Sequence, residues 1–415
     1  MKKILFVLTC ILLIFTGKSV VAEEFSVEAQ HALAIEVSTG KILFDQDGQK
    51  STSIASISKL LSVYLVYEAL DKGEIQLSTM VDISDYPYSL TANTQLSNVI
   101  LDDRSYSVED LLNASLITSS NSAIIALAEK IAGSESAFVD RMKAKLEEWG
   151  ITDGKIVNVS GLDNSDLGEN IYPNSSPEDA NMLSALDVAI IARRLILDFP
   201  QVLAITSQNS YWFGGETYYA TNQMLSEGTH AREGVDGLKT GTSESAGSCF
   251  VATTNQHDMR IITVVLNAHN GIENPENRFM VTNNLMNYIY DNFSLTTFIS
   301  KGQPFENSSI SIFNGQKEKS QAVAASNLNI VQRKHTDKPI TAKFITEADT
   351  FDAPLLSGHK VGILKLVDKD IIGKGYVDGQ TGQLQIDMIL PQDIAEANWP
   401  ASWWNHFVRY VNENL

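Results

Sequence analysis

Two side chains that could act as a nucleophile and its base, Ser56 and Lys59, lie three residues apart. On a helix this spacing places the hydroxyl and the amine on one face, within reach of each other. The residues that follow are apolar on nearly every side up to Gly73, which predicts a buried helix over residues 55–72. A lysine at the start of such a helix loses its hydration, and this favours a neutral amine that can accept a proton. The alternative is an ordinary helix start with a solvated lysine.

Two more polar segments have residue types suited to the same chemistry. Ser119 and Asn121 precede another apolar helix, although a simple helix cap explains this segment equally well when it is taken alone. The other segment consists of Lys239, Thr240, Gly241 and Thr242. There the glycine lets a strand edge approach a ligand closely, and the lysine adds a fixed positive charge.

In this order and with these long intervals, the three segments resemble the motifs Ser-x-x-Lys, Ser-x-Asn and Lys-Thr-Gly of the penicillin-recognising serine enzymes. The resemblance covers most of the chain. It also involves Val159-Ser160-Gly161-Leu162-Asp163, the helical segment 184–195 and Asn222. The family that the chain resembles is that of the low-molecular-mass penicillin-binding proteins, the serine-type D-alanyl-D-alanine carboxypeptidases of peptidase family S11. Within it, the likeness is strongest to the streptococcal enzymes.

This resemblance implies a mechanism. Ser56 attacks the carbonyl between the two terminal D-alanines of a peptidoglycan stem peptide, and Lys59 is the neutral base. Ser119 passes protons to the leaving amine, while Asn121 holds Lys59 and the substrate amide. The backbone N–H groups of Ser56 and Thr242 form the oxyanion hole. The same serine is expected to be acylated by β-lactams, and no cofactor or metal is implied.

The expected substrate ends in a free carboxylate, so its pocket needs cations although the chain has a net charge of -19. The resemblance implies that substrate binding involves Lys239, Thr240, Gly241, Thr242 and Arg278. The alternative for Arg278 is an ion pair with a nearby acidic side chain. The strongly negative charge repels phosphate backbones and excludes nucleic acid as an expected partner.

Two other functions compete with this interpretation. A secreted β-lactamase needs a carboxylate that activates water, typically in a Glu-x-x-Leu-Asn segment, and the nearest candidate, residues 169–173, does not match it. A catalytically silent scaffold that binds peptidoglycan is the second alternative, and the intact Ser56, Lys59, Ser119 and Lys239 argue against it. No Gly-x-Ser-x-Gly elbow and no zinc-binding His-Glu-x-x-His segment occurs in the chain.

The elements that must position these side chains mix strands and helices. The patterns predict strands over 32–37, 41–44 and 260–266, and helices over 111–131, 184–197 and 278–291. We therefore expect an α+β catalytic domain over residues 25–293. By the resemblance, it is a β-lactamase/transpeptidase-like domain with an antiparallel sheet flanked by helices. Short alternating runs from 296 to 393 predict a second, all-β domain.

Both ends of the chain indicate export and membrane association. Residues 1–22 begin with two lysines, continue with an apolar run and end in small residues, which is typical of a cleaved signal peptide, with a retained anchor as the alternative. Residues 399–415 form a predicted amphipathic helix rich in Trp and Tyr. Such a helix suits the membrane surface and predicts peripheral attachment on the outer face of the cytoplasmic membrane. The alternative is a helix packed on its own domain.

Overall fold

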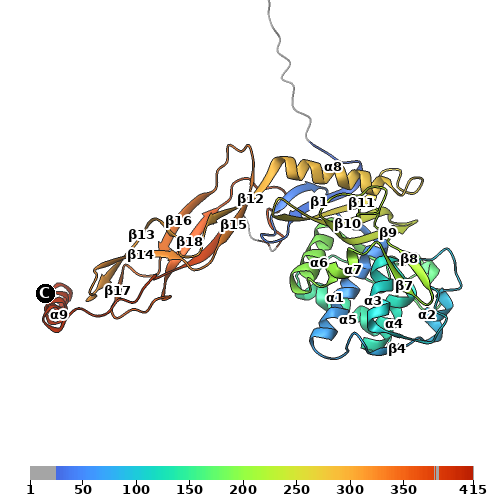
Figure 1. Ribbon diagram of the computed structural model, residues 1–415, viewed down its shortest axis with the longest axis horizontal. Helices are drawn as coiled ribbons and strands as arrows, with labels where there is room; N and C mark the ends of the chain where they lie inside the picture. Colours follow the sequence, from blue (N-terminus) through green and yellow to red (C-terminus); the bar gives the residue numbers. More distant parts are fainter. Residues whose placement is uncertain (1–24, 378, 380–382, 415) are drawn as a thin grey trace, which may run out of the picture.

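A computed structural model describes residues 25–377, 379 and 383–414. The predicted signal peptide, residues 1–22, lies outside this part of the chain. Figure 1 shows a broad domain of helices and strands, a narrow β domain that extends from it, and a single helix at the far end. The α+β class with a following all-β domain and a C-terminal helix is therefore confirmed.

An antiparallel sheet of five strands in the order β2-β1-β11-β10-β9 forms the centre of the broad domain. Its strands are β1 (Ala29–Glu36), β2 (Ile42–Gln46), β9 (Val235–Ser243), β10 (Gly247–Gln256) and β11 (Met259–Ala268). Helix α8 (Asn277–Asn292) covers one face, and the remaining helices of the domain lie on the other face (Figure 1). Because both faces are covered, β10 and β11 are almost continuously buried, although β10 also carries buried polar side chains such as Ser248, Thr253 and Thr254.

The helical layer consists of α1 (Lys59–Asp71), α2 (Asp85–Leu90), α3 (Val108–Ile117), α4 (Asn121–Ala132), α5 (Glu135–Glu148), α6 (Ala185–Asp198) and α7 (Val202–Thr206). Short 3-10 turns are η1 (Ala55–Ser58) and η2 (Asn164–Asp166). The short strand pairs are β3 (Thr52–Ser53) with β6 (Met182–Leu183), β4 (Met80–Asp82) with β5 (Ser105–Ser107), and β7 (Ser210–Phe213) with β8 (Glu216–Tyr219).

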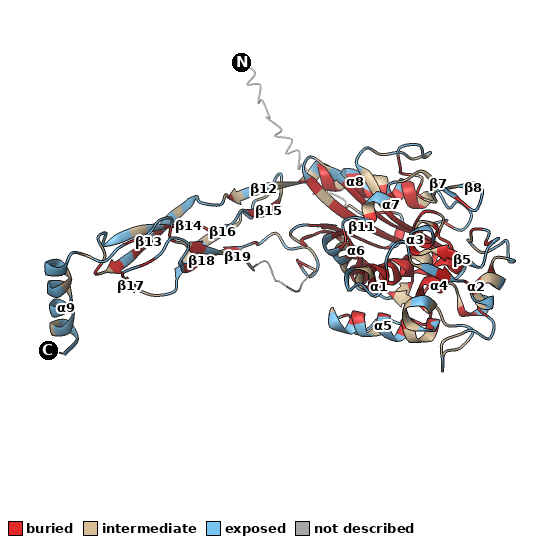
Figure 2. Ribbon diagram, turned by 60° about the horizontal axis from the view of Figure 1, so that its bottom comes forward, coloured by how far each residue is buried: buried red, intermediate tan, exposed pale blue. Residues whose placement is uncertain are grey.

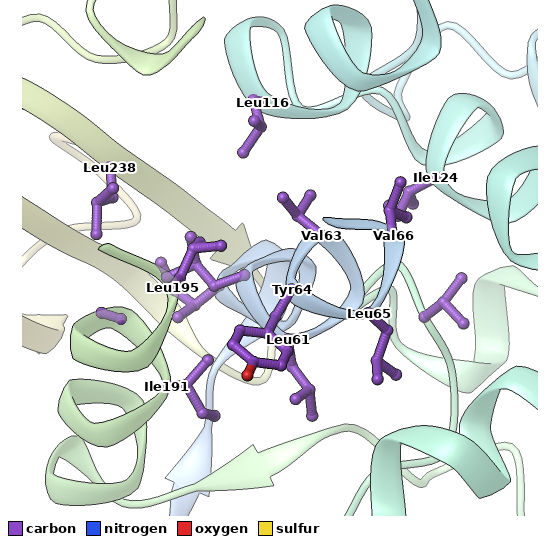
Figure 3. Close-up of a cluster of buried hydrophobic side chains, with 14 of the residues drawn as sticks. Leu61, Val63, Tyr64, Leu65, Val66, Leu116, Ile124, Ile191, Leu195 and Leu238 are labelled. Carbon is purple, nitrogen blue, oxygen red and sulfur yellow. The ribbon is translucent and has the colours of Figure 1, made fainter. Parts of the chain in front are cut away.

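Helix α1 runs through the middle of this layer, as its sequence predicts. Figure 3 views it nearly end-on, with Leu61, Val63 and Leu65 pointing in different directions into apolar surroundings. Leu116 of α3, Ile124 of α4 and Leu195 of α6 are among the side chains that enclose it. A helix buried all round cannot shift without opening the core, so η1 at its start is firmly placed.

The continuous helix predicted over 111–131 is interrupted. Helix α3 ends at Ile117, and α4 begins at Asn121. Ser119 between them has a left-handed φ of 65°, and the Ser120 hydroxyl accepts a hydrogen bond from the Ala123 N–H as the cap of α4. The periodicity of apolar residues continues through the break because both helices pack on the same core.

The second domain is entirely β in the described residues before its final helix. Strand β12 (Phe293–Ile299) pairs with β15 (Leu328–Arg333). A sheet of six strands contains β13 (Pro304–Phe313), β14 (Lys319–Ala324), β16 (Thr341–Thr346), β17 (Thr350–Asp352), β18 (Lys360–Val367) and β19 (Gln383–Ile389). The chain ends in α9 (Trp399–Asn414), and no helix within the described residues is long and apolar enough to cross a membrane.

Candidate active site

Ser56 lies in η1, immediately before α1. Ala55 has a φ of 46°, a left-handed conformation that is costly for a residue with a side chain. Two glycines from distant segments pack against this turn. A Cβ atom at Gly161 would lie 1.9 Å from the carbonyl oxygen of Ala55, and one at Gly241 would lie 2.8 Å from that of Ile54. The partly exposed Ser56 is therefore presented by a strained turn that neighbouring segments hold in place.

The amine of Lys59 is fully buried and lies 2.9 Å from Ser56 Oγ. Its Nζ donates to Asn121 Oδ1 at 2.7 Å and to the carbonyl oxygen of Ser160 at 2.7 Å. Burial lowers the pKa of Lys59 well below its usual value, and the positive charge of Lys239 lowers this pKa further. A neutral amine has two N–H bonds for the two carbonyl oxygens and a lone pair for the serine hydroxyl. This arrangement suits a general base.

Asn121 is the first residue of α4, and its side chain is fixed at both ends. Its Nδ2 donates to the carbonyl oxygen of Ser97 at 3.0 Å, so Oδ1 is turned toward Lys59. Ser119, two residues earlier, is buried in the strained link between α3 and α4. No hydrogen bond to its hydroxyl is recorded among the described residues. Strained backbone of this kind is common where a side chain must be aimed at a substrate.

The segment from Lys239 to Thr242 lies on β9, the edge strand of the sheet next to η1. Lys239 is buried, and its Nζ donates to the carbonyl oxygen of Thr240 at 2.9 Å. Burial lowers the pKa of Lys239 to about 7, and the charge of Arg278 contributes to this shift. The Thr240 hydroxyl donates to that of Thr221 at 2.7 Å, whereas Thr242 is exposed. The free edge of β9 is thus lined by one buried cation and two hydroxyls.

Arg278 lies at the start of α8 and is buried behind β9 and β10. Its Nη1 donates to the carbonyl oxygens of Gly241 and Cys249, and Nε donates to that of Pro275. Within the described part of the chain, no acidic partner and no acceptor for Nη2 are recorded. Arg278 therefore supports the backbone at Gly241, and its predicted contact with a substrate carboxylate stays a prediction.

Three groups that support Lys59 were not predicted from the residue pattern. The carbonyl of Ser160 is a direct partner of its amine, and the neighbouring Val159 carbonyl accepts a hydrogen bond from Ser62 Oγ at 2.7 Å. The Val159 N–H donates to the buried carboxyl of Glu135 at 3.0 Å. Burial raises the pKa of Glu135 to about 7. A main-chain carbonyl is not identified by its residue type, so only the resemblance at residues 159–163 pointed to this segment.

The geometry places a partly exposed serine hydroxyl beside a buried lysine amine, an arrangement suited to a nucleophile and its base. Comparison with known proteins identifies the family. The family described as D-alanyl-D-alanine carboxypeptidase matches residues 18–270, and the penicillin-binding protein 5 C-terminal domain matches residues 293–396. The chain therefore belongs to the D-alanyl-D-alanine carboxypeptidase family of serine peptidases, which confirms the resemblance seen in the motifs.

Several relatives match most of this chain. The chain is 26% identical over 353 residues to D-alanyl-D-alanine carboxypeptidase DacF of Bacillus subtilis, covering 83% of this chain and 82% of the relative. A solved structure of a peptidoglycan synthesis regulatory factor (PBP3) from Streptococcus pneumoniae is 47% identical, with a TM-score of 0.82, and the match covers 89% of this chain and 100% of that one. Penicillin-binding protein D2 of Listeria monocytogenes in its ampicillin-bound form is 28% identical, with a TM-score of 0.54 over 64% of this chain and 99% of that one.

Proposed function

We propose that this chain removes the terminal D-alanine from peptidoglycan stem pentapeptides through an acyl-enzyme on Ser56, and that it thereby limits cross-linking. The observation that carries the proposal is the buried amine of Lys59, which lies 2.9 Å from Ser56 Oγ and forms no ion pair within the described part of the chain. Membership of the D-alanyl-D-alanine carboxypeptidase family supports the substrate class.

The proposed reaction has two halves. Ser56 Oγ adds to the carbonyl carbon of the penultimate D-alanine while its proton moves to Nζ of Lys59. The C–N bond then breaks, and Ser119 passes the proton to the departing D-alanine amine. Water adds to the ester with Lys59 again as the base, which frees the shortened peptide and restores the Ser56 hydroxyl.

In this proposal the substrate binds along the edge of β9. Lys239, Thr240 and Arg278 hold the terminal carboxylate of the substrate, and Asn121 holds its amide. The backbone N–H groups of Ser56 and Thr242 stabilise the oxyanion, where one such donor contributes about 3 kcal/mol in comparable sites. Gly241 allows the backbone to approach the acylated serine closely.

Fluorescent penicillin and a short peptide ending in D-Ala-D-Ala test this proposal together. Ser56→Ala is expected to lose both labelling and D-alanine release, and mass spectrometry of the wild-type protein should locate the adduct on Ser56. Lys59→Arg should also stop acylation, because a guanidinium remains protonated at accessible pH. Ser51→Ala, an exposed serine just before β3, is the matched control and should behave like the wild type. An adduct on Ser119, or normal acylation of Lys59→Arg, would contradict these roles.

The two competing functions make different predictions in the same assay. A silent scaffold would not label at all. A β-lactamase would hydrolyse penicillin rapidly, leave no lasting adduct and release no D-alanine. Glu169, the nearest sequence candidate for a water-activating carboxylate, is exposed in a loop, which favours the carboxypeptidase.

We also propose that the protein acts on the outer face of the cytoplasmic membrane, held there by α9. This helix contacts the β domain through its polar side: Ser402 accepts from Asn314 Nδ2, and Arg409 donates to Asp352 at 2.7 Å. The opposite side stays open, with Trp403 64% exposed and Tyr410 63% exposed. Figure 2 shows α9 as an exposed helix at the far end of the molecule. Large aromatic side chains left in water in this way suit the interface of a bilayer.

Vesicle binding of the full chain tests the membrane proposal. Replacing Trp403 and Phe407 by serine should release the protein from lipid vesicles, because their stacked rings contribute much of the apolar area of α9. Asn412→Ala, a change on the polar side, is the control and should bind as the wild type does. Binding should survive high salt but not detergent, since few charges lie on the helix. Equal binding by the double variant and the wild type would contradict the proposal.

A further inference from the structure

The hairpin of β7 and β8 has two aromatic faces, of which only one is packed. Gly214 and Gly215 form its tight turn with φ values of 56° and 90°. The pairing places Trp212 opposite Thr217 and Ser210 opposite Tyr219. Because side chains alternate along a strand, Ser210, Trp212, Thr217 and Tyr219 share one side of the hairpin, which we call the outer face.

The inner face anchors the hairpin to the segments that carry the candidate active site. Phe213 is buried and stacks on Tyr106 with ring centroids 4.9 Å apart. The Tyr218 hydroxyl accepts from the Ile100 N–H at 3.0 Å, in the loop whose Ser97 carbonyl holds Asn121. The hairpin is therefore a rigid platform rather than a loose loop.

The outer face presents rings to solvent. Trp212 is 68% exposed and Tyr219 is 72% exposed, and the residues opposite them, Thr217 and Ser210, contribute only neutral hydroxyls. Diagonal neighbours on a β pair lie about 7–8 Å apart, so the two rings are adjacent. An uncharged aromatic face on a protein with a net charge of -19 is unusual enough to suggest an uncharged ligand.

The hairpin leads directly into a residue that contacts the candidate substrate-binding strand. Only Ala220 separates Tyr219 from Thr221, whose hydroxyl accepts the hydrogen bond from Thr240 on β9. Two residues of extended chain span about 7 Å. A stem peptide whose fourth residue is attacked at Ser56 extends about 13 Å from that point to the sugar that carries it, at about 3.3 Å per residue. We therefore expect the sugar end of the substrate to come near the outer face when its peptide lies along β9.

We propose that the outer face of the β7–β8 hairpin binds a pyranose ring of the glycan strand to which the stem peptide is attached. The face of a sugar that carries axial C–H bonds packs against the electron-rich face of an aromatic ring, and nearby hydroxyls can bond to the sugar. This inference rests on the proposed function, because it assigns the glycan end of the same substrate.

Two substrates separate this inference from the function on which it rests. The full-length wild type, Trp212→Ala, Tyr219→Ala and the double variant are compared on a short D-Ala-D-Ala peptide and on isolated peptidoglycan rich in pentapeptides. The short peptide should be cleaved equally well by all four. On the polymer, kcat/KM should fall by about five- to tenfold for the double variant, a loss typical of exposed aromatic contacts. Met280→Ala, an exposed apolar side chain on α8, is the control and should change neither rate.

Direct binding provides an independent readout. Glycan strands stripped of their peptides should be retained by the wild type and lost by the double variant. Equal polymer rates in the double variant and the wild type, or an equal loss on both substrates, would overturn the inference. A wild-type chain that releases no D-alanine from the short peptide would contradict the proposed function instead, while glycan-strand retention would still decide the role of the outer face.

Discussion

At the scale of single residues, the candidate site is notable for containing two buried lysines. Lys59 and Lys239 are both nearly free of solvent contact, and each has a lowered pKa. In the proposed reaction their tasks differ, because Lys59 must be neutral to take a proton from Ser56, whereas Lys239 must be charged to attract a carboxylate. The charge on Lys239 favours the neutral form of Lys59, so binding and activation are linked electrostatically.

This division of roles predicts a particular pH dependence. Burial holds the pKa of Lys239 at about 7, so the free enzyme loses this positive charge as the pH rises through that value. We expect kcat/KM for a peptide with a free terminal carboxylate to fall above about pH 7, since kcat/KM reports the free enzyme. Lys239→Arg keeps its charge and should remove this fall.

The matched control is the same peptide with its terminal carboxylate converted to an amide. The amide has no anion for Lys239 to hold. Its kcat/KM should therefore not decrease as the pH rises above about 7, whatever its absolute rate. An identical decrease for the acid and the amide would assign the titration to another group.

The residue types and their spacing identified the groups that the structure brings together most closely. Ser56, Lys59 and Asn121 form one hydrogen-bonded set although 62 positions separate Lys59 from Asn121. The contact of the Ser160 carbonyl with Lys59 was not predicted, because the pattern of side chains does not reveal which backbone oxygens take part in a site. Arg278 was located correctly at the start of a helix, but its burial behind β9 depends on the packing of α8 and could not be predicted.

At the scale of elements, close packing of backbone segments shapes the site. Segment 159–163 and strand β9 both lie against η1, and each does so at a glycine, Gly161 and Gly241. A side chain at either position would push a segment away from the nucleophile. These short contacts explain why a glycine follows Ser160 and another follows Thr240.

Gly161→Ala should therefore damage both stability and acylation. Its φ is 80°, and the added Cβ would meet the Ala55 carbonyl, so we expect a loss of about 3 kcal/mol or more and at least a tenfold slower reaction with penicillin. Gly133→Ala is a close control, because Gly133 has a φ of 82° but open space around it. That variant should lose only about 1–2 kcal/mol and should acylate normally. Chemical unfolding measures the loss of stability, and stopped-flow labelling measures the rate of acylation. Equal behaviour of the two variants would argue against a role for the close contact between Gly161 and Ala55.

Apolar periodicity revealed the long elements and missed the short ones. Residues 55–72, 184–197 and 278–291 were predicted as helices and correspond closely to η1 with α1, to α6 and to α8. The break at Ser119 depends on a left-handed residue and a serine cap, neither of which disturbs the apolar pattern. Two-residue strands such as β3 and β6 are stabilised by tertiary contacts, so their local sequence does not predict them.

At the scale of the whole molecule, a buried ion pair joins the two domains. Lys41, between β1 and β2, pairs with Asp368 of the β domain and donates to the Val331 carbonyl at 2.9 Å. The Tyr376 hydroxyl donates to the same carboxylate at 2.9 Å. The backbone N–H of Ile42 also donates to the carbonyl oxygen of Gly375 at 2.8 Å. This arrangement fixes the direction in which the β domain extends from the candidate active site toward α9 (Figure 1).

Lys41→Met should uncouple the domains because it leaves Asp368 charged and buried. Breaking a buried pair on one side costs about 3–5 kcal/mol, whereas replacing both partners by apolar residues is often close to neutral. Calorimetry should thus show a lower, divided unfolding transition for Lys41→Met and partial recovery in the double variant with Asp368→Leu. Lys50→Met, which removes a pair with Asp47 at 66% and 55% side-chain exposure, should change stability by no more than about 1 kcal/mol.

Small-angle X-ray scattering supplies the geometric part of this test. The distribution of interatomic distances should broaden toward both shorter and longer values in Lys41→Met, since the domains then reorient about the link between α8 and β12. Cleavage of a short D-Ala-D-Ala peptide should persist, because the nucleophile and its base lie wholly within the first domain. If the scattering profile and the unfolding transition stayed those of the wild type, the two-stranded pair of β12 and β15 would be sufficient to hold the domains, and Lys41 would not determine their orientation.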